Sequence, residues 1–237
     1  MSWIKRTDGC DVFDIELFVS AVFGWPLLEG AIVAILLCAV VQTASLLIGL
    51  GTAALATSPR LWVRLSITAY VWLFRGAPAL LILLFVWNGL PQLIPALRAN
   101  WFSPFLAASI ALTLIEVAYV TEILRSAYSA VGAGQREGAH ALGLKRWHTF
   151  VYVVLPQAMR IATPALVNEL ISLLKTTSLA TVISLRELMT VTSLAIASSF
   201  RFLEWYAAVL VYYMAMVSAL TFAQSRIEKV LSRGHVK

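Results

Sequence analysis

The sequence predicts an all-α membrane protein with about five transmembrane helices. Hydrophobic residues make up 60% of the 237 residues and charged residues only 13%, whereas about 25% of the residues in soluble domains are charged. The mean hydropathy is +0.85. Five apolar runs are each long enough to supply the roughly 20 helical residues that cross a bilayer. No stretch between these runs is long enough for a separate soluble domain.

The first two expected spans differ in regularity. Residues 30–59 carry no charged side chain and predict one long helix. The second span is expected within residues 65–97, where Arg75 is the only charge. Three prolines in this run, at positions 78, 91 and 95, predict a kink and a frayed end, because proline lacks the amide hydrogen that a helix interior requires.

The remaining three spans are expected at residues 101–124, within 150–185 and at 205–225. In the third span, Glu122 precedes Arg125 by three residues, a spacing that predicts a local ion pair on one helix face. Glu116 lies deeper in the same span. A carboxylate at such a depth is costly and usually faces a cavity or a partner, so Glu116 is a candidate substrate contact that would favour a cationic substrate.

The distribution of positive charges predicts the orientation of the chain, because cytoplasmic loops retain Lys and Arg. Ten of these residues fall on the side of the 125–149 loop and the C-terminus, and five fall on the opposite side. We therefore expect a periplasmic N-terminus and a cytoplasmic C-terminus. The net charge of +6 is scattered over span ends rather than gathered into one patch, which argues against nucleic-acid binding.

A compact polar turn separates the third and fourth spans, where residues 137–156 read EGAHALGLKRWHTFVYVVLP. Glu137, Gly138 and Ala139 should open a short helix and Gly143 should break it, before Leu155-Pro156 begins the return into apolar sequence. The pattern resembles the EAA loop of ABC-transporter permeases, which runs Glu-Ala-Ala, three residues, Gly, nine residues, Ile-x-Leu-Pro.

This resemblance implies a cytoplasmic coupling helix that docks on an ATP-binding subunit. The spacing is kept throughout, with Gly138 in place of the first Ala and Val153 in place of Ile. The carried-over coupling positions are Glu137, Gly138, Ala139, Gly143, Leu155 and Pro156. The alternative is an ordinary solvated loop between membrane helices.

Three further segments resemble permeases of the polar amino-acid uptake type, whose relatives carry histidine, arginine, lysine, glutamine or opines. They are FRGAPALLILLFVWNGLP at 74–91, AYVTEILRSAYSAVGAGQREGA at 118–139 and LPQAMRIATPALVNELISLLKTTSLATVISLREL at 155–188. Ala77 stands where Thr is common in the first of these. The resemblance covers most of the chain after about residue 30 and implies a type I ABC importer permease.

The fourth span contains a polar stripe, consisting of Asn168, Glu169, Ser172, Lys175 and Thr176. At 100° per residue these five side chains share an arc of about 120° on one helix, and the intervening leucine and isoleucine side chains lie outside it. We expect the stripe to face the protein interior. Its carboxylate and amide could bind the ammonium of an amino acid, and its lysine could bind the carboxylate. The alternative is a structural polar seam between helices.

The resemblance also implies the partners, which are a homodimer of ATP-binding subunits, a second permease, similar or identical, and a periplasmic solute-binding protein. The chain contains no GxxxxGK[ST] phosphate loop, so ATP and Mg²⁺ would be used by the partner ATPase. No catalytic residue, metal site or bound cofactor is expected in this chain. Its expected parts are a periplasmic segment at 1–26, a permease domain at 27–230 with a coupling loop at about 132–149, and a cytoplasmic tail at 231–237.

Two other functions stay open on the residues alone. A secondary transporter driven by an ion gradient would also place polar groups at the membrane midplane, but it normally needs more spans and repeated halves. A membrane-embedded enzyme would need a cluster of His, Asp and Glu side chains at acid-base or metal spacing. Glu116 and Glu169 alone do not make such a cluster. The preferred interpretation is a bacterial inner-membrane importer subunit for a polar amino acid, a basic amino acid or an opine.

Overall fold

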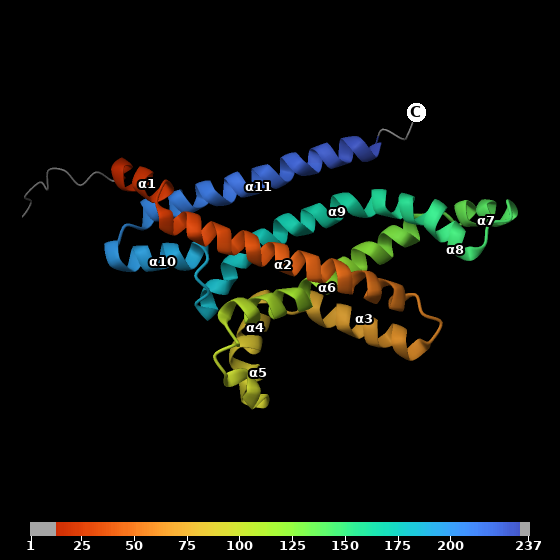
Figure 1. Ribbon diagram of the computed structural model, residues 1–237, viewed down its shortest axis with the longest axis horizontal. Helices are drawn as coiled ribbons and strands as arrows, with labels where there is room; N and C mark the ends of the chain where they lie inside the picture. The colour runs from red at the N-terminus through yellow and green to blue at the C-terminus, as the bar shows by residue number, and fades with distance from the viewer. Residues whose placement is uncertain (1–12, 233–237) are drawn as a thin grey trace, which may run out of the picture.

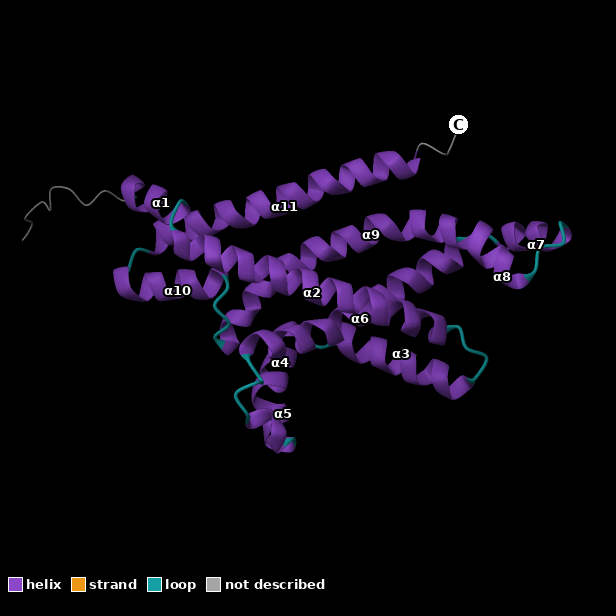
Figure 2. Cartoon of the chain, in the orientation of Figure 1, coloured by secondary structure: helices purple, strands orange, loops and turns teal. Residues whose placement is uncertain are grey.

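A computed structural model describes residues 13–232, and every regular element within that range is a helix (Figure 1, Figure 2). In chain order the segments are α1 (Ile15–Val22), α2 (Trp25–Ala56), α3 (Leu61–Gly76), α4 (Ala79–Leu84), η1 (Phe85–Gly89), α5 (Leu90–Leu93), η2 (Pro95–Arg98), α6 (Pro104–Ala130), α7 (Ala133–Ala141), α8 (Arg146–Thr149), η3 (Phe150–Val154), α9 (Leu155–Thr176), η4 (Thr177–Ile183), α10 (Leu188–Ser199) and α11 (Phe202–Ser232). The all-α class is confirmed.

Four segments are long and apolar enough to cross a membrane, namely α2, α6, residues 146–183 and α11. They run roughly along one direction, with α7 and α8 at one end of the bundle and α1 and α10 at the other (Figure 1). The first, third, fourth and fifth expected spans are therefore confirmed. α2 begins at Trp25, earlier than expected, because Pro26 falls in its first turn, where an amide hydrogen has no helical partner.

The second span is broken rather than kinked. α3 ends at Gly76, and the helix that resumes at Ala79 points 103° away from it. Pro78 causes the break, because the residue before a proline is disfavoured in the helical region, and Ala77 is extended with φ −81° and ψ 137°. The expectation of one kinked span is corrected, since residues 61–93 form a broken span or a re-entrant loop. α4 and α5 leave the side of the bundle (Figure 1).

Small residues allow α2 and α6 to pack closely at the centre of the bundle. Ala107 and Ala111 on α6 are fully buried, and a Cβ atom added to Gly49 on α2 would lie 2.5 Å from Val120 Cγ1. Close backbone approach of this kind drives helix association in a bilayer, where lipid tails are as apolar as the side chains. α6 also contacts α3, α4 and α9, so the helix that carries Glu116 is held from several sides.

At the end of the bundle that carries α1 and α10, contacts between α1 and α11 hold the helices together. The side chain of Asp14 caps α1, and its backbone amide donates to Glu204 Oε1 on α11 at 3.0 Å. Tyr212 of α11 donates its hydroxyl to the carbonyl of Val22 at 2.8 Å. α1 falls in the expected N-terminal segment, whose first twelve residues, like most of the expected tail, lie outside the described residues.

Candidate functional site

The loop between α6 and α9 folds into the two short helices α7 and α8 at one end of the bundle (Figure 1). α7 begins at Ala133, four residues before Glu137. The expectation that Glu137 opens this helix is therefore wrong, since Glu137 lies in its middle, beyond the turn where the helix dipole favours a carboxylate. The helix starts earlier because Gly132 supplies an extended N-cap conformation, which glycine tolerates.

The break after α7 depends on Gly143, as expected. Gly143 has a φ of 80°, a conformation that glycine adopts readily and other residues rarely do. Its amide donates to the carbonyl of His140 at 2.9 Å, and the amide of Leu144 donates to the carbonyl of Ala139 at 3.1 Å. Paired bonds of this kind end a helix with glycine just past its last turn. The turn is confirmed, and a role in docking stays a prediction.

The surface of this loop combines charged and apolar side chains. Glu137 and Gly138 are exposed and Ala139 is buried, while Leu142 is 83% exposed and Trp147 is 69% exposed. Large apolar side chains at the tip of a polar loop are typical of a protein interaction site. Leu142 and Trp147 are not pattern positions of the family loop, so the resemblance alone does not identify them. Their signal in the sequence is two bulky apolar residues in an otherwise polar run.

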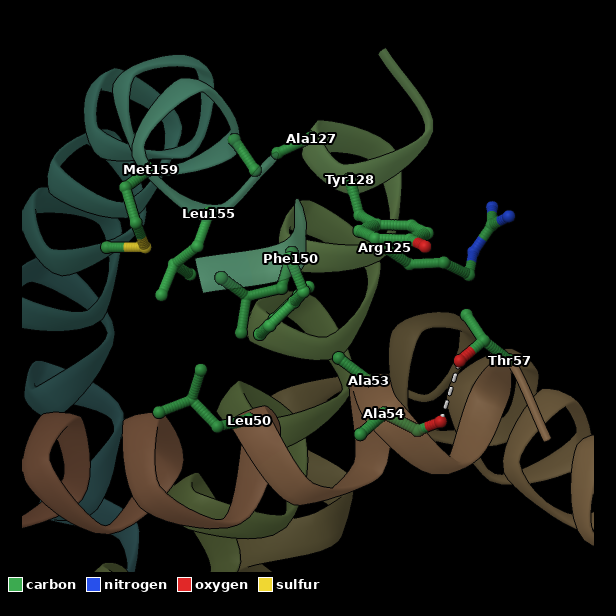
Figure 3. Close-up of a pocket in the computed structure, with 12 residues that line it drawn as sticks. Leu50, Ala53, Ala54, Thr57, Arg125, Ala127, Tyr128, Phe150, Leu155 and Met159 are labelled. Atoms are coloured by element: carbon green, nitrogen blue, oxygen red, sulfur yellow. Dashed lines mark hydrogen bonds between the residues drawn. The ribbon is translucent and has the colours of Figure 1, made fainter. Parts of the chain in front are cut away.

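A cavity of about 290 Å³ lies directly behind the loop, between the C-terminal turns of α2 and α6 and the beginning of α9. Figure 3 shows Tyr128, Phe150, Leu155 and Met159 around this space. Leu155, a pattern position, therefore lines the cavity, and Pro156 lies in the first turn of α9. The preceding residues form the π-helix η3, a winding that is rare and frequent at functional sites.

The expected ion pair of the third span is confirmed. Arg125 Nη2 lies 2.6 Å from Glu122 Oε1, and Arg125 Nε donates to Glu122 Oε2 at 3.0 Å. Both side chains are partly exposed, so the pair is expected to contribute about 0.2–1 kcal/mol to stability. Arg125 also lies beside the cavity (Figure 3), which places this pair near the loop rather than near Glu116.

The polar stripe lies along one face of α9, but that face points away from the core of this chain. Asn168, Ser172 and Lys175 are exposed, whereas Glu169 and Thr176 are partly buried. The buried side of the same helix carries leucines 173 and 174. The expectation of an inward-facing stripe is therefore not met within a single chain. The stripe faces inward only if another chain covers it.

Glu116 is the member of the predicted site that the fold buries most deeply. It is 4% exposed, and its Oε2 atom has no hydrogen-bond partner among the described residues. Glu169, on the contacting helix α9, carries a second carboxylate in this part of the bundle. Burying a carboxylate without a partner is costly, so two neighbouring carboxylates favour the binding of a cation between them.

Two further polar side chains of the bundle, Arg75 and Gln42, are not assigned to the site by the sequence patterns. Arg75 of α3 acts electrostatically on Glu169, and its guanidinium lies 5.4 Å from the centre of the Tyr119 ring. Arg75, Glu116 and Glu169 are called the polar cluster below. Gln42 of α2 has a buried Oε1 atom with no partner among residues 13–232. The sequence gives no sign of this grouping, because its members come from different helices.

Comparison with known proteins gives consistent matches over most of the chain. Residues 45–233 match the family described as binding-protein-dependent transport system inner membrane component. The glutamine transport system permease protein GlnP of Escherichia coli is 35% identical over 210 residues, which is 86% of this chain and 94% of GlnP. The arginine transport system permease protein ArtQ of Bacillus subtilis is 35% identical over 209 residues, covering 86% and 92%. The crystal structure of an amino acid ABC transporter with histidines superposes with a TM-score of 0.83 at 29% identity, covering 92% of this chain and 99% of that chain.

Proposed function

The chain belongs to the binding-protein-dependent transport system inner membrane component family and is the permease subunit of an ABC importer, and on this premise we propose that its substrate is a polar amino acid with a cationic side chain. The observation that carries the proposal is the buried Glu116 carboxylate, whose Oε2 atom has no hydrogen-bond partner among residues 13–232. The relatives named for glutamine and arginine transport support the amino-acid class.

In the proposed site, groups of opposite charge bind the two ends of an amino acid. The carboxylates of Glu116 and Glu169 accept hydrogen bonds from ammonium or guanidinium groups, which charge assistance makes strong. Lys175 is six residues after Glu169, about 9 Å along the helix, and would bind the substrate carboxylate. Asn168, Ser172 and Thr176 lie on the same face and supply neutral hydrogen-bonding groups. The polar stripe and the polar cluster together would form the lining of a translocation path.

The proposed path requires a second permease. Asn168, Ser172 and Lys175 are exposed on α9, and charged or polar groups exposed to lipid are unfavourable, so such groups are expected to face a cavity or another protein. A second copy of this chain, or a similar permease, placed against this face of α9 would enclose the stripe. The membership in a binding-protein-dependent system implies an ATPase and a solute-binding protein as further partners, and two ATPase copies would serve two permeases.

The proposed orientation places α7 and α8 in the cytoplasm of the bacterial cell. α11 ends at the same end of the bundle as α7, whereas α1 lies at the opposite end (Figure 1). The end with α7 carries the larger share of Lys and Arg, as expected for the cytoplasmic side. Glu137, Leu142 and Trp147 would then face the ATPase, and α1 would lie on the periplasmic side.

The test is import into proteoliposomes that contain the permease, its ATPase and its binding protein. Labelled L-arginine, L-lysine, L-histidine, L-glutamine and octopine form the panel, with ATP inside or absent. We expect ATP-dependent import of the cationic amino acids, and a loss of about tenfold or more in Glu169→Gln, which removes a buried charge partner at similar volume. Thr163→Ala, on α9 but outside the polar stripe, is the control. Preferred import of glutamine that Glu169→Gln leaves unchanged would contradict the cationic assignment.

A further inference from the structure

Arg136 joins the coupling helix α7 to the end of α6. It lies on α7, and its Nη2 donates to the carbonyl oxygen of Val131 at 2.9 Å. Val131 is the C-cap of α6 and is 2% exposed. The last carbonyls of a helix lack intrahelical partners, and an arginine that donates to them also interacts favourably with the helix dipole. The bond therefore crosses the turn at Gly132 and ties two helices together.

The same guanidinium makes a second contact with α6. It lies 5.0 Å from the centre of the Tyr128 ring, within the range of a cation–π interaction. Tyr128 in turn neighbours Phe150, at 6.4 Å between ring centres, and Phe150 neighbours the exposed Trp147 at 5.9 Å. Arg136 Nε is buried and has no partner among the described residues. Arg136 is thus fixed on α6 by its terminal nitrogen and its flat face.

The two connections that leave the coupling loop differ in construction. Toward α9, the chain passes the positive-φ turn at Gly143, the short helix α8 and the π-helix η3, beside the 290 Å³ cavity. Toward α6, one residue separates Val131 from α7, and Arg136 bridges that turn. The cavity adjoins both α6 and α9, but the irregular π-helical winding lies only on the α9 side of the loop. The bridged turn leaves α7 and α6 to move together.

We propose that Arg136 is a positioning residue that makes α6 follow the coupling helix when the ATPase moves it. α6 contacts α2, α3 and α9 and carries Glu116, which precedes Val131 by 15 residues, or about 22 Å of helix. Movement of α7 would reach the polar cluster through this rigid helix. The inference rests on the proposed function, and it adds a residue that the family pattern of the loop does not contain.

The experiment uses the complete reconstituted complex with Arg136→Met, Arg136→Lys and Tyr128→Leu. Arg64→Met is the matched control, because Arg64 is an exposed arginine on α3. Recovery of the ATPase on affinity-purified permease, basal hydrolysis, and hydrolysis stimulated by the binding protein with L-arginine or L-glutamine are measured. Arg136→Met should keep recovery and basal hydrolysis and lose about tenfold in stimulation. Arg136→Lys should be intermediate, because an ammonium can donate to the carbonyl but lacks the flat guanidinium.

A double-mutant cycle separates this role from a merely structural one. In the double variant Arg136→Met/Tyr128→Leu, the stimulation of ATP hydrolysis should be no lower than in the more impaired single variant, because both substitutions remove the same contact. Stimulation that equals the parent in Arg136→Met, or that falls only in proportion to the ATPase recovered, would overturn the proposal. If Arg136→Met does not assemble with the ATPase, the test is made with Tyr128→Leu. Full stimulation of ATP hydrolysis in Tyr128→Leu would also overturn the proposed role of Arg136.

A substrate-independent measurement keeps this inference separate from the proposed function. A parent complex that imports no member of the panel would refute the function. The thiol of Cys38 on α2 still reports on the α2–α6 region, because Cys38 is buried in the same apolar cluster as Ile115 of α6. The sequence contains one other cysteine, Cys10, which is replaced by serine in this experiment. Maleimide labelling of Cys38 should then change on addition of ATP in the parent and much less in Arg136→Met. A change in labelling on addition of ATP that is as large in Arg136→Met as in the parent would contradict the proposal.

Discussion

Two glycines of α2 lie in opposite environments, one in the contact with α6 and one facing open space. An added Cβ at Gly49 would lie 2.5 Å from Val120 Cγ1 and 3.0 Å from Val120 Cβ. At Gly51, two residues later, an added Cβ would have nothing within 4 Å. Gly49→Ala and Gly51→Ala therefore add the same methyl group to the same helix, once against α6 and once into open space.

The two substitutions should change the free energy of unfolding in opposite directions. In Gly51→Ala the gain in helix propensity, up to about 1 kcal/mol, is unopposed. In Gly49→Ala the methyl group must displace Val120, which is fully buried and has one strongly preferred rotamer in a helix. Overpacking of this kind costs about 1–3 kcal/mol, and the gain in helix propensity is the same for both substitutions, so Gly49→Ala should be the less stable variant by about 1–3 kcal/mol.

The assay is thermal unfolding of the purified permease, followed by circular dichroism, with import measured in parallel. Val120 lies about one turn from Glu116 on α6, so Gly49→Ala should weaken import as well as stability. Gly51→Ala should import like the parent. Equal unfolding temperatures, or a more stable Gly49→Ala variant, would refute the close approach of α2 and α6 on which this reasoning depends.

Three further predictions concern the coupling loop and the orientation of the chain. Gly143→Ala should reduce ATPase recovery on affinity-purified permease, because the φ of 80° at this position disfavours any side chain. Gly138→Ala should recover as much ATPase as the parent, because a Cβ added at Gly138 would have nothing within 4 Å. Equal recovery in both variants would show that the turn is not needed. Leu142→Ser should lower ATPase affinity by about tenfold if this 83% exposed side chain is an anchor of the interface, and an unchanged affinity would place the interface elsewhere. A reporter fused after Lys237 should be cytoplasmic and a cysteine at Asp11 should be labelled from the periplasm; both positions on one side would require an even number of crossings.

The sequence predicts the long spans well because length and apolar composition alone decide whether a helix can cross a bilayer. It also predicts the Glu122–Arg125 pair and the turn at Gly143, since both depend on neighbours within one turn. Pro78 predicts that a helix ends there, but not where the chain goes next. The bend of 103° depends on how α4 packs against η4 and α6, which no local rule contains.

The candidate site is less predictable because its members come from distant parts of the chain. Glu116 and Glu169 are separated by 53 residues (169 − 116 = 53), and their proximity follows from the packing of α6 against α9. The start of α7 is hard to place from the sequence for a different reason. α7 begins at Ala133 with Gly132 as its N-cap and without a side-chain cap, so no Ser, Thr, Asn or Asp marks this start in the sequence.

The direction of the polar stripe connects the fold to the proposed mechanism. Helical periodicity places Asn168, Ser172 and Lys175 on one face but cannot say what that face meets. In this chain the face is exposed, while Glu116 on the neighbouring helix is buried and its Oε2 atom has no partner in the described part of the chain. A translocation path lined only by this chain would be open on the side of the exposed stripe. Placing a second permease against α9 would enclose the stripe and leave the Glu116 and Glu169 carboxylates beside the enclosed space, so permease pairing and substrate binding would depend on the same surface.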